Sequence, residues 1–226
     1  MNKTTIAYKS KNILIDELIK QSNIEVLKEK NFFSKLFSKK EFPDIYFHSS
    51  ILNDESIENI KNSKIVIVNS FSIKKEIIEK IEILNEKIEV IYPSISVEIQ
   101  NIENIKTKVF EELKIDLEDK IIFFTAKNFK TSGVKEFLDI CSDLNYEKFK
   151  IIIAGTNQQI NSLKFQLNKY NNLQEKLILL DDYKNIDEIF MIADIFVLPT
   201  YNKSFSSNIL KAMFYECVVF VTYKMM

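Results

Sequence analysis

The sequence predicts an α/β protein built from two parallel sheets, each covered by helices. Between residues 151 and 213 the strand candidates are short and apolar on both faces, as in buried strands, and along the whole chain helical stretches alternate with apolar runs. Several strands end at a glycine, an acid or a proline: 151–154 at Gly155, 177–180 at Asp181 and 195–198 at Pro199. In parallel sheets the ligand face lies at the carboxyl ends of the strands, so these ends mark the expected site.

In the first half of the chain, apolar runs predict strands at 5–8, 44–47, 64–69 and 88–92. Pro93 then marks a domain boundary. Residues 94–119 are expected to form a linker and a crossing helix, with 107–113 helical. The predicted domains are therefore 1–93, the linker 94–119, and 120–226.

In the second half, the predicted strands are 121–125, 151–154, 177–180, 195–198 and 218–222, all in one parallel sheet. Between the third and fourth of them, a helix places apolar residues at helical spacing on one stripe that should face the sheet: Ile186, Ile189, Phe190 and Ala193. A further helix begins near Ser207, with Ser206 or Ser207 as its cap.

Composition excludes several classes of protein. The chain has 226 residues, 46% of them hydrophobic, which is enough for a globular core. A net charge of -1 argues against nucleic-acid binding. The sequence has neither a long apolar run nor a signal-peptide core, and it predicts a cytoplasmic protein. Cys141 and Cys217 are isolated, and we expect them to pack in the core as reduced thiols.

The motifs of the second half follow one another in a characteristic order. They read Ala154-Gly155, Ala193-Asp194, Pro199-Thr200, then 203–206 (KSFS) and 211–213 (KAM). In order and wording they resemble the donor-sugar half of family 4 (group 1) glycosyltransferases. The resemblance implies a B-type fold of two Rossmann-like doubly wound domains, with 1–93 a shortened acceptor-side domain and 120–226 an incomplete nucleotide-sugar-binding domain.

Two lysines stand where that family has its pair of motif glutamates. Lys203 and Lys211 keep the family spacing, and the resemblance places Lys203 at the donor sugar and Lys211 at the ribose. Lysine has three donors and no acceptor, so it cannot hold two ribose hydroxyls as a carboxylate does. The lysines could instead neutralise a diphosphate at the start of the helix near Ser207. The alternative is that both are solvated surface residues.

The loop after the strand 121–125 resembles the phosphate-binding loop of the family. Gly133 and Gly155 both fall on family glycine positions, Lys127 replaces the phosphate-binding arginine, and Ser132 replaces a lysine. Lys127 keeps the positive charge of the arginine but cannot form the two parallel hydrogen bonds of a guanidinium group. Lys130 offers a substitute cation or is an ordinary loop residue. The resemblance implies further donor-binding positions at Tyr183, Ser204, Phe205, Ser206 and Ser207.

The first half resembles the acceptor domain of the family less completely. Pro43, Asp44 and His48 match a family pattern in which a histidine follows a strand, and His48 is the candidate general base. The alternative is that His48 is a hydrogen-bonded packing residue. No glycine-rich loop follows the first strand.

One segment suggests a partner. The stretch 28–42, which begins at Lys28 and ends at Phe42, would as a helix carry phenylalanines on one side and lysines at the margin, a pattern of peripheral contact with anionic lipid. The alternative is an amphipathic helix packed on the first sheet. Asp181 and Asp182 are adjacent acids and not a metal-binding Asp-x-Asp pair, so no metal site is predicted.

The sequence therefore predicts a glycosyltransferase-like protein. By resemblance it would transfer a sugar from a nucleotide-diphosphate sugar to a saccharide or lipid-linked acceptor. The transfer would proceed with retention and without a metal ion or other cofactor. Because lysines replace the motif glutamates, we expect the activity to be impaired. The resemblance also implies a role in polysaccharide or lipopolysaccharide biosynthesis. Lipid contact through the stretch 28–42 would place the protein at the inner face of the membrane. The alternative is a non-catalytic remnant or regulatory subunit. Another nucleotide-using Rossmann enzyme is disfavoured because Gly-x-Gly-x-x-Gly is absent. The strand 218–222, without a covering helix, is expected to leave an open sheet edge that makes the protein marginally stable or dependent on a partner.

Overall fold

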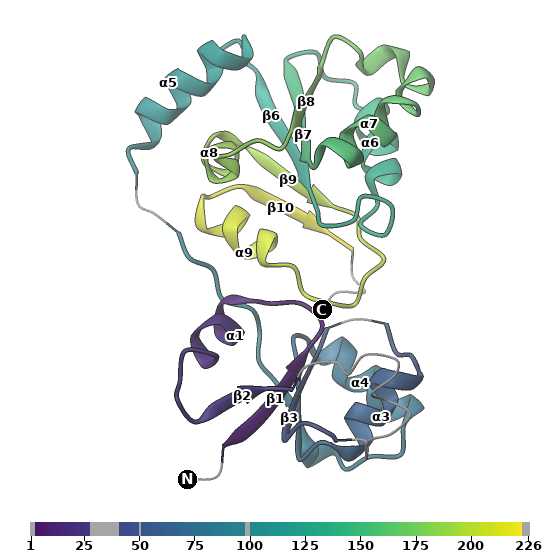
Figure 1. Cartoon of the computed structure of the whole chain (residues 1–226). Helices are drawn as coiled ribbons and strands as arrows, with labels where there is room; N and C mark the ends of the chain where they lie inside the picture. Colours follow the sequence, from purple (N-terminus) through teal and green to yellow (C-terminus); the bar gives the residue numbers. More distant parts are fainter. Residues whose placement is uncertain (1–2, 28–40, 50, 98–99, 223–226) are drawn as a thin grey trace. The chain divides into compact units, whose positions relative to one another are not determined.

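The computed structural model describes residues 3–27, 41–49, 51–97 and 100–222. These residues form two compact units. One unit runs to Ser94 and includes Lys203–Phe205, and the other runs from Ile95 to Asn202 and resumes at Ser206. Each contains one five-stranded sheet (Figure 1), and every strand pairing in both sheets is parallel. The predicted α/β fold with two parallel sheets is confirmed.

The first unit has the strand order β2-β1-β3-β4-β5. Its strands are β1 (Thr4–Tyr8), β2 (Ile24–Val26), β3 (Ile45–His48), β4 (Ile65–Val68) and β5 (Ile88–Val90). Its helices are α1 (Ile13–Leu18), α3 (Asp54–Asn62), α4 (Phe71–Lys80) and the 3-10 helix η1 (Asn85–Lys87). Of these strands, β2 was not predicted, because three residues with a glutamate at the centre are too short to give a periodic signal.

Helix caps and a small aliphatic core shape this unit. Each of the three α-helices begins after a polar residue whose side chain accepts a hydrogen bond from the first turn, namely Asn12, Asn53 and Ser70. Ile60 and Ile77, from α3 and α4, are fully buried against the sheet. The caps fix where the helices start, and the buried isoleucines fix which face they turn inward.

Asp44 joins the amino ends of β1 and β3. Its carboxylate accepts hydrogen bonds from the Thr5 backbone N–H (2.8 Å) and hydroxyl (2.9 Å), and Lys64 Nζ lies 2.7 Å from it. The hydrogen bond from Lys64 is the main cause that lowers the pKa of Asp44 to about 2, and the bonds from Thr5 add to it. Asp44 is therefore a structural residue at the edge opposite the carboxyl ends of the strands.

The second unit has the strand order β10-β9-β6-β7-β8. Its strands are β6 (Lys120–Thr125), β7 (Phe149–Gly155), β8 (Leu177–Asp181), β9 (Ile195–Leu198) and β10 (Val218–Val221). Its helices are α5 (Ile102–Leu113), α6 (Val134–Ser142), α7 (Asn157–Lys164), α8 (Ile186–Ile192) and α9 (Ser207–Phe214), with the 3-10 helices η2 (Leu167–Lys169) and η3 (Asn171–Leu173). All five predicted strands are present in one parallel sheet.

The helix α8 is more deeply buried than its sequence predicted. Ile189 and Phe190 face the core as expected, but Met191 and Ile192 are buried as well. The reason is that α5 packs against α8 and covers its outer side. A single apolar stripe was predicted because the pattern of one helix does not reveal a second helix lying on top of it.

The strand β10 forms one edge of its sheet. Val218 and Phe220 lie on the same face of this strand, and each is 57% exposed. Within the described ranges, no helix combines the length and the apolar character needed to cross a bilayer. The predicted lipid-binding stretch 28–42 falls mostly outside the described residues, which resume at Glu41.

Candidate functional site

The carboxyl edge of the sheet in the second unit carries most of the predicted donor-binding residues. Side chains and backbone groups join the loops at this edge. The amide of Gln159 donates to the carbonyl of Lys127 (3.0 Å), and that of Asn208 donates to the carbonyl of Thr125 (3.2 Å). The backbone N–H of Tyr201 donates to the carbonyl of Thr131 (3.1 Å). The loops after β6 and β9 and the starts of α7 and α9 are therefore fixed to one another.

Both glycines of the chain are required by this arrangement. Gly133 has a φ of 80°, and a Cβ at this position would lie 1.9 Å from the carbonyl oxygen of Pro199. A Cβ at Gly155 would lie 2.4 Å from the ring of Phe129. No side chain fits at either position without a shift of the neighbouring loop. The two glycines therefore allow close contact between the loops that follow β6, β7 and β9.

The loop after β6 presents two exposed cations. Lys127 and Lys130 both have exposed side chains, whereas Ser132 is buried and its N–H is bonded to the carbonyl of Asn128. Among the described residues, no carboxylate forms an ion pair with Lys127 or Lys130. Their ammonium groups are available to an anion at the carboxyl edge.

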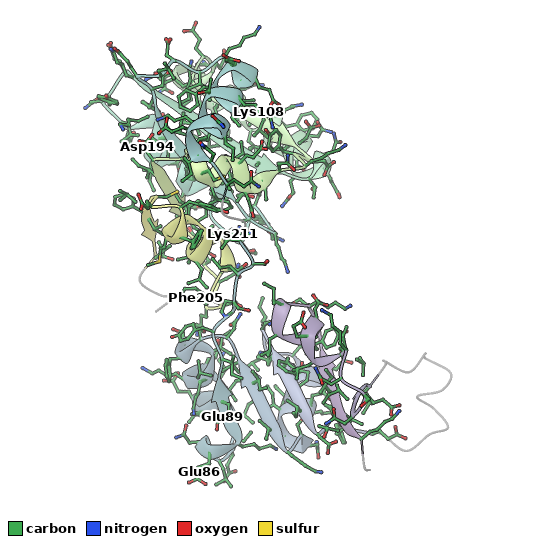
Figure 2. All side chains as sticks on the ribbon, turned by 90° about the vertical axis from the view of Figure 1, so that its left-hand side faces the viewer. Glu86, Glu89, Lys108, Asp194, Phe205 and Lys211 are labelled. Atoms are coloured by element: carbon green, nitrogen blue, oxygen red, sulfur yellow. The ribbon has the colours of Figure 1, made fainter. Side chains whose placement is uncertain are left out.

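Lys211 is in a different environment. It lies on α9, and its Nζ is 2.5 Å from Oδ1 of Asp187 in the first turn of α8. The side chains are 22% and 32% exposed, so the pair is partly shielded from water. Figure 2 labels Lys211 on this helix. The sequence drew attention to Lys211 but not to Asp187, because only the packing of α8 beside α9 brings the two together.

The start of α9 has the cap that the sequence suggested. Ser206 is the cap, and its hydroxyl accepts a hydrogen bond from the backbone N–H of Asn208 (3.3 Å). Ser207 is the first residue of the helix and is exposed.

Tyr183 is held by a buried carboxylate. Its hydroxyl donates to Glu188 on α8 (3.4 Å), which also pairs with Lys108 of α5 (3.0 Å) and accepts from Asn185 (3.2 Å). Burial is the main cause that raises the pKa of Tyr183 to about 12, and the negative charges of Glu112 and Glu188 add to it. This cluster fastens α8 to α5, and it was not predicted from the sequence.

Three predicted donor-site residues belong to the first unit. The backbone carbonyl of Lys203 accepts from the Ser70 hydroxyl (2.8 Å), and the Ser204 hydroxyl accepts from the Asn69 amide (2.7 Å). Phe205 packs edge-on against Tyr92, with ring centroids 5.3 Å apart. The segment Lys203–Phe205 is therefore anchored at the carboxyl ends of β4 and β5.

Lys203 also forms an ion pair with an acid of α4. Its Nζ lies 3.1 Å from the Oε2 of Glu76. The hydrogen bond from Lys80, followed by that from Lys203, holds the pKa of Glu76 below its ordinary value. Lys203 and Lys211 thus each face a carboxylate.

His48 is the last residue of β3 and is 2% exposed. Its ring lies 5.9 Å from that of Tyr46. It is thus at the carboxyl edge of the first sheet, but its ring is covered by neighbouring side chains.

One hollow of the second unit lies away from this edge. It has a volume of about 560 Å³ and is lined by residues at the amino ends of β6, β9 and β10 and by α5, including Lys120, Asp194 and Val218. Asp194 pairs with Lys120 (2.7 Å) and accepts from the N–H of Ile121 (2.8 Å), so it has a structural role. We place the candidate site at the carboxyl edge because ligands of parallel sheets bind there.

The fold, with two Rossmann-like units that each contain one parallel sheet, is the B-type fold of the following glycosyltransferases. The glycosyltransferase WaaG, involved in lipopolysaccharide biosynthesis, is similar over 97% of this chain and 81% of its own, with a TM-score of 0.70 and 10% identity. The lipopolysaccharide outer core galactosyltransferase WaaB is similar over 98% and 80%, with a TM-score of 0.65 and 12% identity. HepE from Anabaena, solved in complex with UDP-glucose, is similar over 78% and 52%, with a TM-score of 0.62 and 16% identity.

The sequence identifies the family. The family described as Glycosyl transferases group 1 matches residues 105–225, more than half of the chain. The chain belongs to this family. It spans about half the length of the HepE chain, of which it covers 52%. No curated protein sequence matches the chain.

Proposed function

We propose that this chain is a family 4 glycosyltransferase whose transfer activity is impaired. Its donor would be a nucleotide-diphosphate sugar, its acceptor a saccharide or lipid-linked saccharide, and the transfer would proceed with retention and without a metal ion or other cofactor. Membership of the group 1 family and the similarity to HepE, which was solved with UDP-glucose, support the donor class.

The donor would bind at the carboxyl edge of the second sheet. Lys127 and Lys130 would supply point charges to the diphosphate, and Gly133 and Gly155 would support the site by allowing its loops to pack closely against Pro199 and Phe129. The N–H groups at the start of α9, near Ser206 and Ser207, add positive potential there. The resemblance to the family also assigns Lys203, Ser204, Phe205 and Tyr183 to donor binding.

The observation that carries the proposed impairment is the pairing of Lys211 with Asp187. A lysine that is 2.5 Å from a carboxylate contributes little net charge to a diphosphate. Lysine at position 127 also lacks the two-point hydrogen bonding of arginine. Donor binding would therefore depend mainly on Lys127 and Lys130, which are exposed and cannot form bidentate hydrogen bonds as arginine does. We expect the donor to bind weakly.

The acceptor would bind at the carboxyl edge of the first sheet. His48 is the candidate base for the acceptor hydroxyl, provided that its ring becomes accessible when the acceptor binds. The stretch 28–42 would contact the cytoplasmic face of a membrane and so place the protein near lipid-linked acceptors. A role in polysaccharide or lipopolysaccharide biosynthesis would follow.

A second candidate is a non-catalytic remnant or regulatory subunit that keeps the fold. The ion pairs Lys203–Glu76 and Lys211–Asp187 favour it, because both lysines have partners within the protein and need no ligand for their charge.

Calorimetric titration with a panel of nucleotide sugars, followed by a transfer assay with membrane-derived acceptors, separates the two candidates. Slow transfer supports the impaired enzyme, and weak binding without transfer supports the regulatory subunit. Lys127→Ala should weaken binding, whereas Lys164→Ala, an exposed lysine on α7, should not. Absence of binding to any nucleotide sugar contradicts the proposed donor site.

A further inference from the structure

The ion pair between Asp187 and Lys211 lies at the carboxyl edge of the second sheet. Its carboxylate comes from α8, and its lysine comes from α9. α8 begins after the loop that follows β8, and α9 begins after the loop that follows β9. Asp187 is in the first turn of α8, and its Oδ1 is 2.5 Å from Lys211 Nζ. The ion pair therefore fixes the position of an acid that is 32% exposed, close to the edge where ligands of such sheets bind.

One oxygen of this carboxylate is available for a ligand. Lys211 donates to Oδ1, and within the described part of the chain no side chain donates to Oδ2 of Asp187. A carboxylate accepts up to about four hydrogen bonds, so the bond to lysine leaves capacity for two hydroxyl donors. In doubly wound folds that bind dinucleotides, an acid at this edge hydrogen-bonds the ribose 2′-hydroxyl.

The other acids near this edge are already used. Glu188 is 8% exposed and holds Lys108, Asn185 and Tyr183. Asp181 accepts from the Asn157 amide (2.8 Å), and Asp182 accepts from the Asn157 backbone N–H (3.3 Å). Those two carboxylates therefore hold the start of α7. Asp187 is the remaining partly exposed acid of α8, and Lys211 holds it in place.

We propose that Asp187 is the group that binds the ribose hydroxyls of the nucleotide, and that Lys211 is its positioning residue. The inference rests on the proposed function, since it assumes that a nucleoside diphosphate binds at this edge. It reverses the role expected for Lys211, because the lysine orients a carboxylate from the neighbouring helix and does not contact the diphosphate. The specificity of the site for a ribose would then depend on Asp187.

The test compares uridine diphosphate with its 2′,3′-dideoxy analogue by NMR titration of the labelled full chain, which measures millimolar dissociation constants. Hydrogen bonds to a charged group contribute ~1.5 to 3 kcal/mol, so the wild-type chain should bind the dideoxy analogue ~10- to 100-fold more weakly. Neither ligand carries a donor sugar, so the hydroxyls of a donor sugar cannot produce the difference in affinity. In Asp187→Asn the ratio of the two dissociation constants should fall to within about threefold.

Three further variants distinguish an effect on ribose binding from an effect on folding. Asp187→Glu keeps a carboxylate and should retain most of the discrimination. Asp182→Asn is the matched control: it lies at the same edge at a φ of 47°, which asparagine tolerates, and it should keep the wild-type ratio. If Asp187→Asn proves unfolded by circular dichroism, Lys211→Met, which frees Asp187 from its partner, should lower the ratio in its place.

The possible outcomes distinguish a wrong role for Asp187 from a wrong proposed function. If wild-type protein binds uridine diphosphate and discriminates against the dideoxy analogue, but Asp187→Asn discriminates equally well, the inference is wrong and the proposed donor site stands. If wild-type protein binds both ligands with equal affinity, the ribose contact does not exist. If it binds neither this nucleotide nor other nucleoside diphosphates, the proposed function itself fails, and the inference fails with it.

Discussion

Exchanging the charges of Lys211 and Asp187 tests whether these two side chains form an ion pair that stabilises the second unit. The change Lys211→Glu would bring a second carboxylate close to Asp187, whose Oδ1 is now 2.5 Å from the lysine. The ion pair between two partly exposed groups contributes about 1 kcal/mol, which the variant loses.

Repulsion adds to that loss. Two like charges about 4 Å apart interact by at most ~4 kcal/mol at an effective dielectric constant of ~20. Movement of the side chains and screening by salt would reduce this to ~1 to 2 kcal/mol. We therefore expect Lys211→Glu to lower the free energy of unfolding of the second unit by ~2 to 3 kcal/mol, and the double variant Asp187→Lys, Lys211→Glu to recover most of it.

Urea unfolding followed by far-ultraviolet circular dichroism, at low and high salt, measures these differences. The loss in Lys211→Glu should shrink at high salt, whereas the matched surface change Lys164→Glu should have an effect within ~0.5 kcal/mol at both. If Lys211→Glu is as stable as the wild-type chain, or if the double variant is less stable than the single one, the two side chains do not form the pair. Nucleotide-sugar binding should likewise not improve in Lys211→Glu alone.

Three further predictions concern other features. Gly133→Ala should destabilise the second unit by more than ~2 kcal/mol in urea unfolding, because its φ of 80° disfavours a side chain and its Cβ would overlap the Pro199 carbonyl; a smaller loss would contradict the close approach. Asp44 has a folded pKa of about 2 against an ordinary 3.8, so its stabilising effect is present above pH 3.8 and is lost as the pH falls toward 2. Because Lys64 is largely exposed, we expect this effect to be about 1 kcal/mol and to be absent in Asp44→Asn, as acid unfolding curves would reveal. Lys127→Arg should tighten nucleoside diphosphate binding by about 3- to 10-fold through bidentate hydrogen bonds, and an unchanged dissociation constant by calorimetry would exclude contact with the phosphates.

The sheets could be predicted from the sequence because their signal is local. Strand β9 is apolar at every position and β6 at its four central positions, and Gly155 and Pro199 mark the ends of β7 and β9. The two helices α5 and α8 illustrate the limit. Local pattern predicted that both exist, but α5 begins at Ile102 and not at 107, and the packing of α5 on α8 was not predicted. The motif spacing likewise identified Lys211 without its partner, since Asp187 lies 24 residues earlier and reaches it only through the packing of α8 beside α9.

Some lysines of the predicted donor site form ion pairs with carboxylates and others do not, and this difference indicates where a diphosphate would bind. Lys203 and Lys211 each lie within 3.1 Å of a carboxylate, whereas Lys127 and Lys130 have no ion pair within the described residues. A diphosphate that approached Lys203 or Lys211 would have to compete with Glu76 or Asp187 for the ammonium group, and it would face the repulsion of that carboxylate. The same diphosphate near Lys127 meets two exposed cations and no paired acid. The phosphate contacts should therefore lie on the loop after β6, and the two motif lysines should act through the carboxylates that they hold.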